Sequence, residues 1–364
     1  MKLEKHSEGK MVFWSAPSLS KSAFFNPEAE LQRDISVCVL QAWQRQSGQS
    51  LTVCDALAAA GVRGLRYAKE VQGIKQVTLN DKNPFAVKVI RKNILLNRLS
   101  KVCNTSCADA NVLFHQNIFD FIDIDPFGSP NLFLDAAGRS VWHNGFLAVT
   151  ATDTAPLSGS VPKACFRKYA ISTFKGAPFY PELGIRTLVS FIILAMARRD
   201  RAFVPVLSHA TRHYFRCYGR IEHAGAIDSL LKKFGFVSYN PRTGEHRISS
   251  QPIEKWPFAG PLYLGPIQDR SFVKEVLNDL KLRDFRQKYV EGKLLNLLAD
   301  EADAPPVDWD LHVLASKLKV PATGMDDVML GLKRKGRFAV RTHFCPTAVK
   351  TNAGYDEMKK FLLS

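Results

Sequence analysis

The 364-residue sequence lacks cysteine pairs, long apolar runs and an excess of acidic residues. Its seven cysteines are odd in number and scattered, without a Cys-x-x-Cys pair, which argues against a disulfide framework and a zinc ribbon. The longest apolar stretches, such as residues 188–197, are too short to cross a bilayer. Residues 1–10 are charged and contain no apolar segment of a secretory signal. We therefore expect a cytoplasmic protein with reduced thiols and no membrane partner.

Basic residues outnumber acidic ones, 50 to 34, which gives a net charge of +16. A protein of this charge usually binds a polyanion, and a merely basic solvated surface is the alternative. Residues 162–220 contain 11 Lys and Arg but two acids, and residues 333–337 read Lys-Arg-Lys-Gly-Arg. Neither segment is of low complexity, so we expect both on folded elements. We predict that residues 198–220 and 333–337 bind the phosphates of a nucleic acid.

The predicted elements alternate as in an α/β protein with a mostly parallel sheet. A first helix is expected at 26–46. Further helices are expected at 63–70, 84–97, 131–141 and 182–199, and strands at 51–57, 76–79, 119–124 and 145–152. Two more strands, at 202–209 and 214–220, lie close together in the sequence. We expect them to pair antiparallel at one edge of the sheet.

This alternation ends near residue 224, where we place a domain boundary. Residues 1–224 are predicted to form the α/β domain, and residues 225–364 a smaller α+β domain. Helices are expected there at 271–282, 294–301, 310–318 and 326–335, with a strand at 338–344. Two short helices followed by a strand are the order of a winged helix, and an ordinary α/β unit has the same order.

Small and acidic residues follow three consecutive predicted strands, where α/β proteins bind nucleoside cofactors. After the first strand, the chain reads DALAAAGVRG over residues 55–64, in which Arg63 can pair with a free carboxylate. Asp81 follows the second strand and can accept both hydroxyls of a ribose. Asp109 and Ala110 follow a third candidate strand, which precedes the strand at 119–124, and can meet an adenine edge. No Gly-x-Gly-x-x-Gly turn for a pyrophosphate is present. This favours S-adenosylmethionine over a dinucleotide, although the glycine pattern separates the two only partly.

The sharpest motif is Asp-Pro-Phe-Gly-Ser-Pro at residues 125–130, directly after a predicted strand. An exocyclic amino group on a base is a poor nucleophile because its lone pair is delocalised into the ring. Asp125 can accept an N–H from such a group and later take the proton, and the Pro126 carbonyl is a second acceptor. Phe127 offers a stacking face for a base taken out of its stack. The motif therefore predicts methylation of a base amine, and a plain strand-end turn is the alternative.

Together these motifs resemble the tRNA guanosine-26 N2-dimethyltransferases, in their shorter archaeal-type form. The resemblance also rests on FFNP at 24–27, TATDTAPLSG at 150–159, ELGIR at 182–186 and GPLYLGP at 260–266. It implies a class I S-adenosylmethionine-dependent methyltransferase domain with a Rossmann-like sheet, followed by a C-terminal domain that helps hold tRNA.

The resemblance also implies roles for single residues. The residues expected to bind S-adenosylmethionine are Arg33, Arg63, Asp81, Asp109 and Ala110. Asp125 is expected to be the catalytic acceptor, with Pro126 and Phe127 binding the target base. Many relatives carry paired cysteines after the strand that corresponds to 214–220. Residues 222–250 contain no cysteine here, so we expect no metal.

We therefore predict an enzyme that transfers two methyl groups in succession from S-adenosylmethionine to N2 of guanosine 26 in tRNA, without an obligate protein partner. A methyltransferase for an exocyclic amine of rRNA or DNA is one alternative. A catalytically silent tRNA-binding module is another, which the intact Asp81 and Asp125 disfavour. The missing pyrophosphate turn disfavours a nicotinamide dehydrogenase.

Overall fold

A seven-stranded sheet organises the larger part of the molecule. The computed structural model describes residues 3–17 and 22–363, and the sheet order is β5-β4-β3-β6-β7-β9-β8. The strands are β3 (Leu51–Asp55), β4 (Ile74–Asn80), β5 (Cys103–Ser106), β6 (Phe119–Ile124), β7 (Val141–Ala151), β8 (Ala202–Thr211) and β9 (Tyr214–Glu222). The first five run parallel, whereas β9 is antiparallel to β7 and β8. This confirms the predicted antiparallel pair at the sheet edge.

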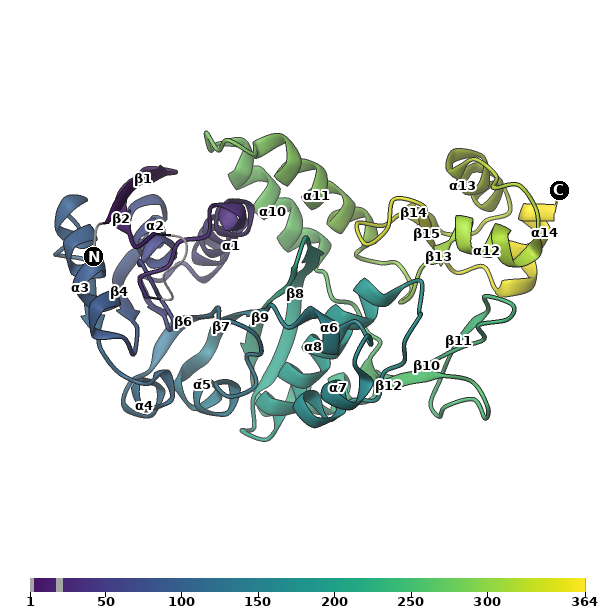
Figure 1. The fold of residues 1–364 in the computed structure, drawn as a ribbon, viewed down its shortest axis with the longest axis horizontal. Helices are drawn as coiled ribbons and strands as arrows, with labels where there is room; N and C mark the ends of the chain where they lie inside the picture. The colour runs from purple at the N-terminus through teal and green to yellow at the C-terminus, as the bar shows by residue number, and fades with distance from the viewer. Residues whose placement is uncertain (1–2, 18–21, 364) are drawn as a thin grey trace.

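Helices cover both faces of the sheet (Figure 1). They are α1 (Glu30–Ser47), α2 (Val62–Glu70), α3 (Pro84–Leu96), α4 (Ala110–Gln116), α5 (Leu134–Ser140), α6 (Thr154–Leu157), α7 (Pro162–Tyr169) and α8 (Tyr180–Ala197). Side chains alternate along each strand: Phe121 and Phe146 pack with α1 and α2, and Ile122 and Leu147 pack with α5 and α8. Helix α8 has the length and apolarity of a membrane span, but 72% of it is buried inside the protein.

Several predicted element boundaries differ from the observed ones by a few residues, and two of the differences have a clear local cause. The helix predicted from residue 26 begins with a 3-10 turn, Pro27–Ala29, and α1 starts at Glu30. The Asn26 side chain accepts from the Glu28 backbone N–H and so caps this short turn first. The helix predicted to reach residue 141 ends at Ser140, because Val141 pairs with Phe119 as the first residue of β7.

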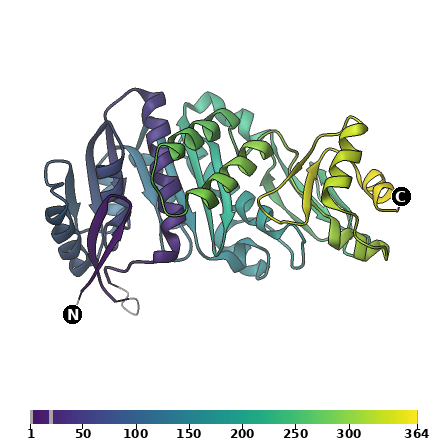
Figure 2. The ribbon, with the colours of Figure 1, turned by 90° about the horizontal axis from the view of Figure 1, so that it is seen from above.

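An N-terminal hairpin and a helical hairpin complete the α/β part. The hairpin strands are β1 (Glu4–Glu8) and β2 (Met11–Ser15). Helices α10 (Arg270–Lys281) and α11 (Lys288–Glu301) lie beside α1, as the view from above shows (Figure 2). Phe272, Val276 and Leu298 join the same buried cluster as α1 and β3. Residues beyond the predicted boundary at 224 thus help to build the core of the α/β part.

The remaining C-terminal elements extend the molecule along its long axis, so that the termini lie at opposite ends (Figure 1). After a short turn (Ala224–Ala226) and α9 (Ile227–Leu231) comes a sheet of order β11-β10-β12. Its strands are β10 (Phe234–Tyr239), β11 (His246–Ser249) and β12 (Phe258–Tyr263). The last unit has its own small core around Trp309, Leu332 and Val349.

This last unit contains three short antiparallel strands and three helices. The sheet order is β13-β15-β14, with β13 at Trp309–Asp310, β14 at Ala339–Arg341 and β15 at Ala348–Thr351. The helices are α12 (Leu311–Leu318), α13 (Met325–Arg334) and α14 (Tyr355–Leu363). The predicted order of two helices and a strand is present. The strand is shorter than predicted, and its partner β15 was not anticipated.

Candidate functional site

The loops that follow β3, β4 and β5 are tied together by one side chain, Asn80. Its Nδ2 donates to the carbonyls of Ala56 (3.0 Å) and Ala108 (3.1 Å), and its Oδ1 accepts from the Ala108 backbone N–H (3.2 Å). The backbone N–H of Ala58 donates to the Asn80 carbonyl (2.8 Å). The small residues after β3 allow this close approach, so three strand ends form one rigid edge of the sheet.

The predicted cofactor residues Asp81, Asp109 and Ala110 lie on this edge. The Asp81 carboxylate accepts from the backbone N–H groups of Ala59 (3.0 Å) and Asn83 (2.9 Å) and is half-buried. Asp109 is exposed and caps α4, and Ala110 is buried in the first turn of that helix. The backbone N–H of Ala110 therefore has no acceptor one turn earlier in the helix. The edge combines a fixed carboxylate, an exposed carboxylate and a free backbone donor.

Arg63 and Asp125, which were predicted to do different tasks, contact each other directly. The buried Arg63 guanidinium donates from Nη1 to Ser36 Oγ (2.9 Å) and from Nη2 to Gln32 Oε1 (2.8 Å). Nη2 also forms an ion pair with Asp125 Oδ2. Helix α1 thus aims Arg63 at the end of β6. Neither Gln32 nor Ser36 was identified from the sequence, because polar residues on a helix carry no sign of what they will contact.

Behind this pair lies a fully buried ion pair between Asp123 and Arg216. Arg216 donates from Nη1 to Asp123 Oδ1 (2.9 Å) and from Nη2 to Oδ2 (2.6 Å), and Tyr67 OH donates to Oδ2 (2.6 Å). Burial acts to raise the pKa of Asp123, but Arg216 and Arg63 hold this pKa below its usual value. The prediction that Arg216 binds nucleic-acid phosphate is wrong, because its side chain is 0% exposed and faces Asp123.

Asp55, at the end of β3, is a second buried carboxylate of the site. Its Oδ2 accepts from the backbone N–H of Gly64 at 2.9 Å. Burial, and then the nearby Asp123 charge, raise the pKa of Asp55 to about 7. A Cβ at Gly64 would lie 3.0 Å from Asp55 Oδ2, so glycine permits this approach of α2 to β3.

The predicted base-binding residues stand on a loop that the neighbouring strand holds in place. Pro126 is buried, whereas the Phe127 ring is 76% exposed, with the Phe24 ring 5.5 Å away in an edge-on arrangement. The Gly128 backbone N–H donates to Thr152 Oγ1 (2.7 Å), and the Thr152 N–H donates to the Gly128 carbonyl (2.9 Å). A large exposed apolar ring on a fixed loop suits the stacking of a base.

Arg33 is not brought together with Arg63 and Asp81. Its guanidinium lies on another side of α1, where Nε donates to Glu8 Oε1 (2.6 Å) and Nη2 donates to the Asn26 carbonyl (3.0 Å). A role for Arg33 in cofactor binding stays a prediction.

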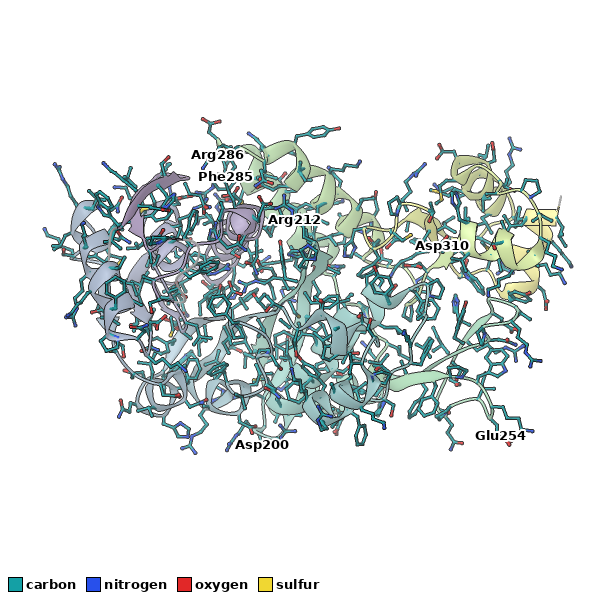
Figure 3. The ribbon with its side chains drawn as sticks, viewed as in Figure 1. Asp200, Arg212, Glu254, Phe285, Arg286 and Asp310 are labelled. Atoms are coloured by element: carbon teal, nitrogen blue, oxygen red, sulfur yellow. The ribbon has the colours of Figure 1, made fainter. Side chains whose placement is uncertain are left out.

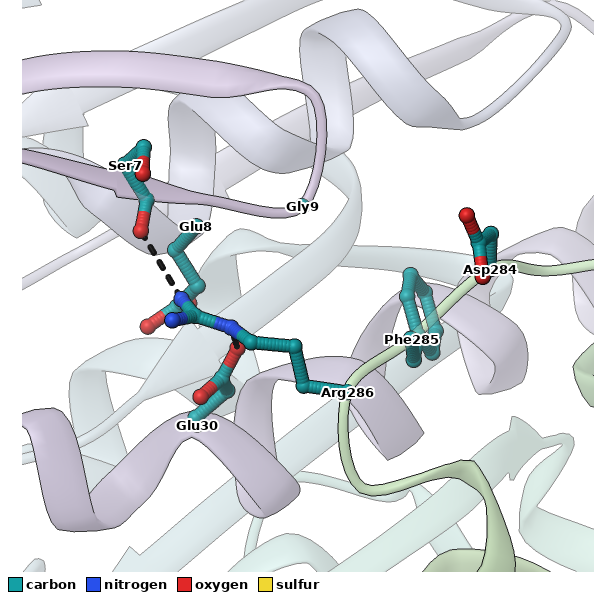
Figure 4. A pocket seen from close by; sticks show the side chains of 7 residues that line it. All are labelled: Ser7, Glu8, Gly9, Glu30, Asp284, Phe285 and Arg286. Atoms are coloured by element: carbon teal, nitrogen blue, oxygen red, sulfur yellow. Dashed lines mark hydrogen bonds and ion pairs between the residues drawn. The ribbon is translucent and has the colours of Figure 1, made fainter.

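A cavity of about 230 Å³ lies next to Glu8, between the N-terminal hairpin and the loop before α11 (Figure 4). Arg286 crosses it, donating to the Ser7 carbonyl (2.9 Å) and to Glu30 Oε1 (3.0 Å). None of the predicted site residues lines this cavity.

The two basic segments differ in what their side chains contact. The stretch 198–220 does not form one patch, since Asp200 lies at the lower margin of the view and Arg212 lies beside α1, at the two ends of β8 (Figure 3). Arg212 pairs with Glu28 (2.6 Å) and Arg220 with Asp269 (3.2 Å). Residues 333–337 are all exposed at the end of α13, and Arg337 among them pairs with Glu357 (2.9 Å). Among the residues that the structure describes, 3–17 and 22–363, no cluster of three His, Cys, Asp or Glu is arranged to hold a metal ion.

Residues 6–363 match the family of N2,N2-dimethylguanosine tRNA methyltransferases. The chain belongs to this family. The tRNA (guanine(26)-N(2))-dimethyltransferase of Methanothermobacter thermautotrophicus is 37% identical over 362 residues, which cover 96% of this chain and 94% of that protein. The enzyme of the same description from Methanosarcina mazei is 36% identical over 367 residues, covering 96% and 93%.

Among solved structures, Trm1 from Pyrococcus horikoshii in complex with S-adenosyl-L-methionine is similar over nearly the whole chain. The TM-score is 0.92 at 33% identity, with 99% of this chain and 100% of that chain covered. These findings confirm the resemblance inferred from the motifs and the predicted fold class, a Rossmann-like methyltransferase domain with a C-terminal extension. The roles of the individual site residues stay predictions.

Proposed function

We propose that this member of the family transfers two methyl groups from S-adenosylmethionine to N2 of guanosine 26 in tRNA. The observation that carries the proposal is the loop Asp-Pro-Phe-Gly, in which Asp125 lies beside Arg63 and Phe127 extends into solvent. The loop puts an acceptor and a stacking surface next to the sheet edge that carries Asp81. The full-length match to the family supports the same activity.

The residues at the sheet edge fit the three parts of this cofactor. Asp81, which two backbone N–H groups orient, keeps further lone pairs for the ribose hydroxyls. Asp109 and the free backbone N–H of Ala110 complement the amino group and a ring nitrogen of adenine. Arg63 is the buried cation for the methionine carboxylate. When bound, S-adenosylmethionine supplies an electrophilic methyl group.

The chain's own residues then hold the base and accept its proton. Arg63 engages Oδ2 of Asp125, which leaves Oδ1 to accept an N–H of the guanine amino group. The Pro126 carbonyl is the second acceptor, and the Phe127 ring, with Phe24 against it, stacks on the base. Once the amino group has gained a methyl group, Asp125 takes the released proton. The monomethylated amine keeps one N–H for a second round.

We further propose that tRNA is the macromolecular partner, that the C-terminal part from residue 225 helps to hold it, and that the enzyme is cytoplasmic. The exposed basic side chains of residues 333–337 and the net charge of +16 support binding to RNA. A methyltransferase for an amine of rRNA or DNA is the competing function, since a stacking loop and a carboxylate acceptor suit any base with an exocyclic amine.

The test is incubation of the protein with S-adenosylmethionine labelled in the methyl group and an unmodified tRNA transcript, followed by digestion to nucleosides. The matched control is the same transcript with adenosine at position 26, and rRNA and DNA are parallel substrates. We expect label in N2,N2-dimethylguanosine from the first transcript alone. Label in rRNA or DNA, or label that persists in the position-26 control, would reject the proposal.

A further inference from the structure

Helix α7 presents two contrasting faces next to the base-binding loop. Lys163, Phe166 and Arg167 are exposed, with the Phe166 ring 59% exposed, whereas Cys165 and Tyr169 are buried. The helix carries three basic residues and no acid. Within the described chain, neither Lys163 nor Arg167 forms a hydrogen bond or an ion pair. Unpaired cations beside an exposed aromatic ring are the features that bind phosphates and stack bases.

The buried face of α7 is bonded to the loop that carries Phe127. Tyr169 OH accepts from Ser129 Oγ (2.8 Å) and donates to Asp153 Oδ1 (2.7 Å). Lys168 Nζ donates to the other oxygen of Asp153 (3.0 Å), and Asn131 Nδ2 donates to the Lys168 carbonyl (3.3 Å). Burial raises the pKa of the Tyr169 hydroxyl, which therefore keeps the proton that it donates.

Distance along the chain places this network close to the target base. Ser129 is two residues from Phe127, and two residues span at most about 7 Å of chain. Arg167 and Lys163 precede Tyr169 by two and six residues on the same helix, about 3 and 9 Å along its axis, so the cationic face of α7 lies within reach of the nucleotides that flank the stacked base. Arg216 on β9 and Arg212 after β8 are less available to RNA phosphates, because Arg216 is buried and Arg212 pairs with Glu28.

We propose that α7 is an RNA-docking helix that also fixes the base-binding loop. Lys163 and Arg167 bind phosphates that flank the target nucleotide, and Tyr169 with Asp153 holds Ser129, and through it Phe127, in the stacking position. Tyr169 and Asp153 are positioning residues, since their contacts are with the loop. The proposal rests on the proposed function and names the surface by which that site meets its RNA.

The docking half is tested by tRNA binding across a salt series. In Lys163→Ala/Arg167→Ala, we expect the slope of log affinity against log salt to flatten by about 1.4 to 1.8, because each lost phosphate contact contributes about 0.7 to 0.9. S-adenosylmethionine affinity should not change. The matched control is Lys69→Ala/Lys75→Ala, which removes the same charge from exposed sites where α2 ends and β4 begins. These sites lie at the amino ends of the parallel strands, away from the carboxyl ends that carry the site. A slope equal to that of the wild type would overturn the docking role.

The positioning half is tested by Tyr169→Phe, which keeps the ring and removes the hydroxyl. Since misplacement of a reacting group by about 1 Å can cost 100-fold in rate, we expect kcat to fall at least tenfold while tRNA and cofactor affinities stay within twofold. Amide hydrogen exchange of residues 126–131 should be faster. The control is Tyr214→Phe, because the buried Tyr214 hydroxyl has no hydrogen-bond partner among the described residues. Unchanged kcat and unchanged exchange in Tyr169→Phe would overturn this role.

These measurements separate this proposal from the proposed function. The salt series and the hydrogen exchange need no methyl transfer, so they read the role of α7 even if the target nucleoside is not guanosine 26. Conversely, label in N2,N2-dimethylguanosine with identical salt slopes would support the activity and reject α7 as its RNA-docking surface.

Discussion

Replacing Asp123 with asparagine should destabilise the fold strongly, because it leaves the buried Arg216 guanidinium without its counter-charge. Both side chains are 0% exposed and share two hydrogen bonds, at 2.9 and 2.6 Å. An asparagine at this position can accept one of these bonds, but its amide N–H groups would face the Arg216 donors. Removal of one partner from such a buried pair costs about 3–5 kcal/mol, whereas an exposed pair contributes about 0–1 kcal/mol.

The assay is urea unfolding at pH 7, monitored by circular dichroism, with the free energies of unfolding of wild type and variant compared at the urea midpoint. The control is Asp135→Asn, which breaks the exposed Asp135–Arg198 pair (3.5 Å) and should cost less than about 1 kcal/mol. The double variant Asp123→Asn/Arg216→Met removes both charges and should lose less than the sum of the two single changes. A loss below about 1 kcal/mol for Asp123→Asn would refute the argument that the pair is electrostatically coupled in the core.

Four further predictions follow from the site. The pKa of Asp55 is about 7 in the fold against 3.8 for a free aspartate, so the folded state binds the extra proton and stability falls as pH rises from about 4 to 7. Between pH 5 and pH 8 the wild type should therefore lose roughly 3 kcal/mol of stability relative to Asp55→Asn, as measured by urea unfolding at the two pH values. An equal change in stability in the two proteins would contradict this prediction. Asp81→Ala should weaken the binding of S-adenosylmethionine by roughly 1.5–3 kcal/mol. An affinity equal to that of the wild type in calorimetry would exclude the role of Asp81 in holding the ribose. Asp125→Asn should lower turnover about 100-fold while cofactor and tRNA affinities hold, and retained turnover would make the carboxylate structural. Changing the four basic residues of 333–337 to alanine should flatten the slope of log tRNA affinity against log salt. A slope identical to that of the wild type would place this segment away from the RNA.

The central sheet and the residues at its carboxyl edge could be predicted from the sequence, because both depend on local sequence patterns. Apolar strands that end in Asp55, Asp81 and Asp125 are readable without a structure, since parallel strands present their carboxyl ends at one edge. The polar partners of these residues are not readable. Arg216 lies 93 positions from Asp123, and its charge alone made it look like an RNA contact.

The same limit applies to the ends of the chain. Arg33 is held by Glu8 from the N-terminal hairpin, a contact across 25 residues that no periodic sequence pattern predicts. The short strand β15 has four residues, too few for an alternating pattern to stand out. Helix α10 was predicted as a helix, but its packing against α1 depends on tertiary contacts between segments more than 200 residues apart.

The place of α10 and α11 against α1 has a consequence for how the protein is made. Phe272, Val276 and Leu298 fill the same cluster as residues of α1 and β3, which are synthesised first. On the ribosome, the early α/β segment must therefore wait with an uncovered apolar surface until about residue 300 has emerged. This surface favours binding of a chaperone to the unfinished chain, and it makes the emergence of α10 and α11, more than the closure of the first strands, the event that completes the core.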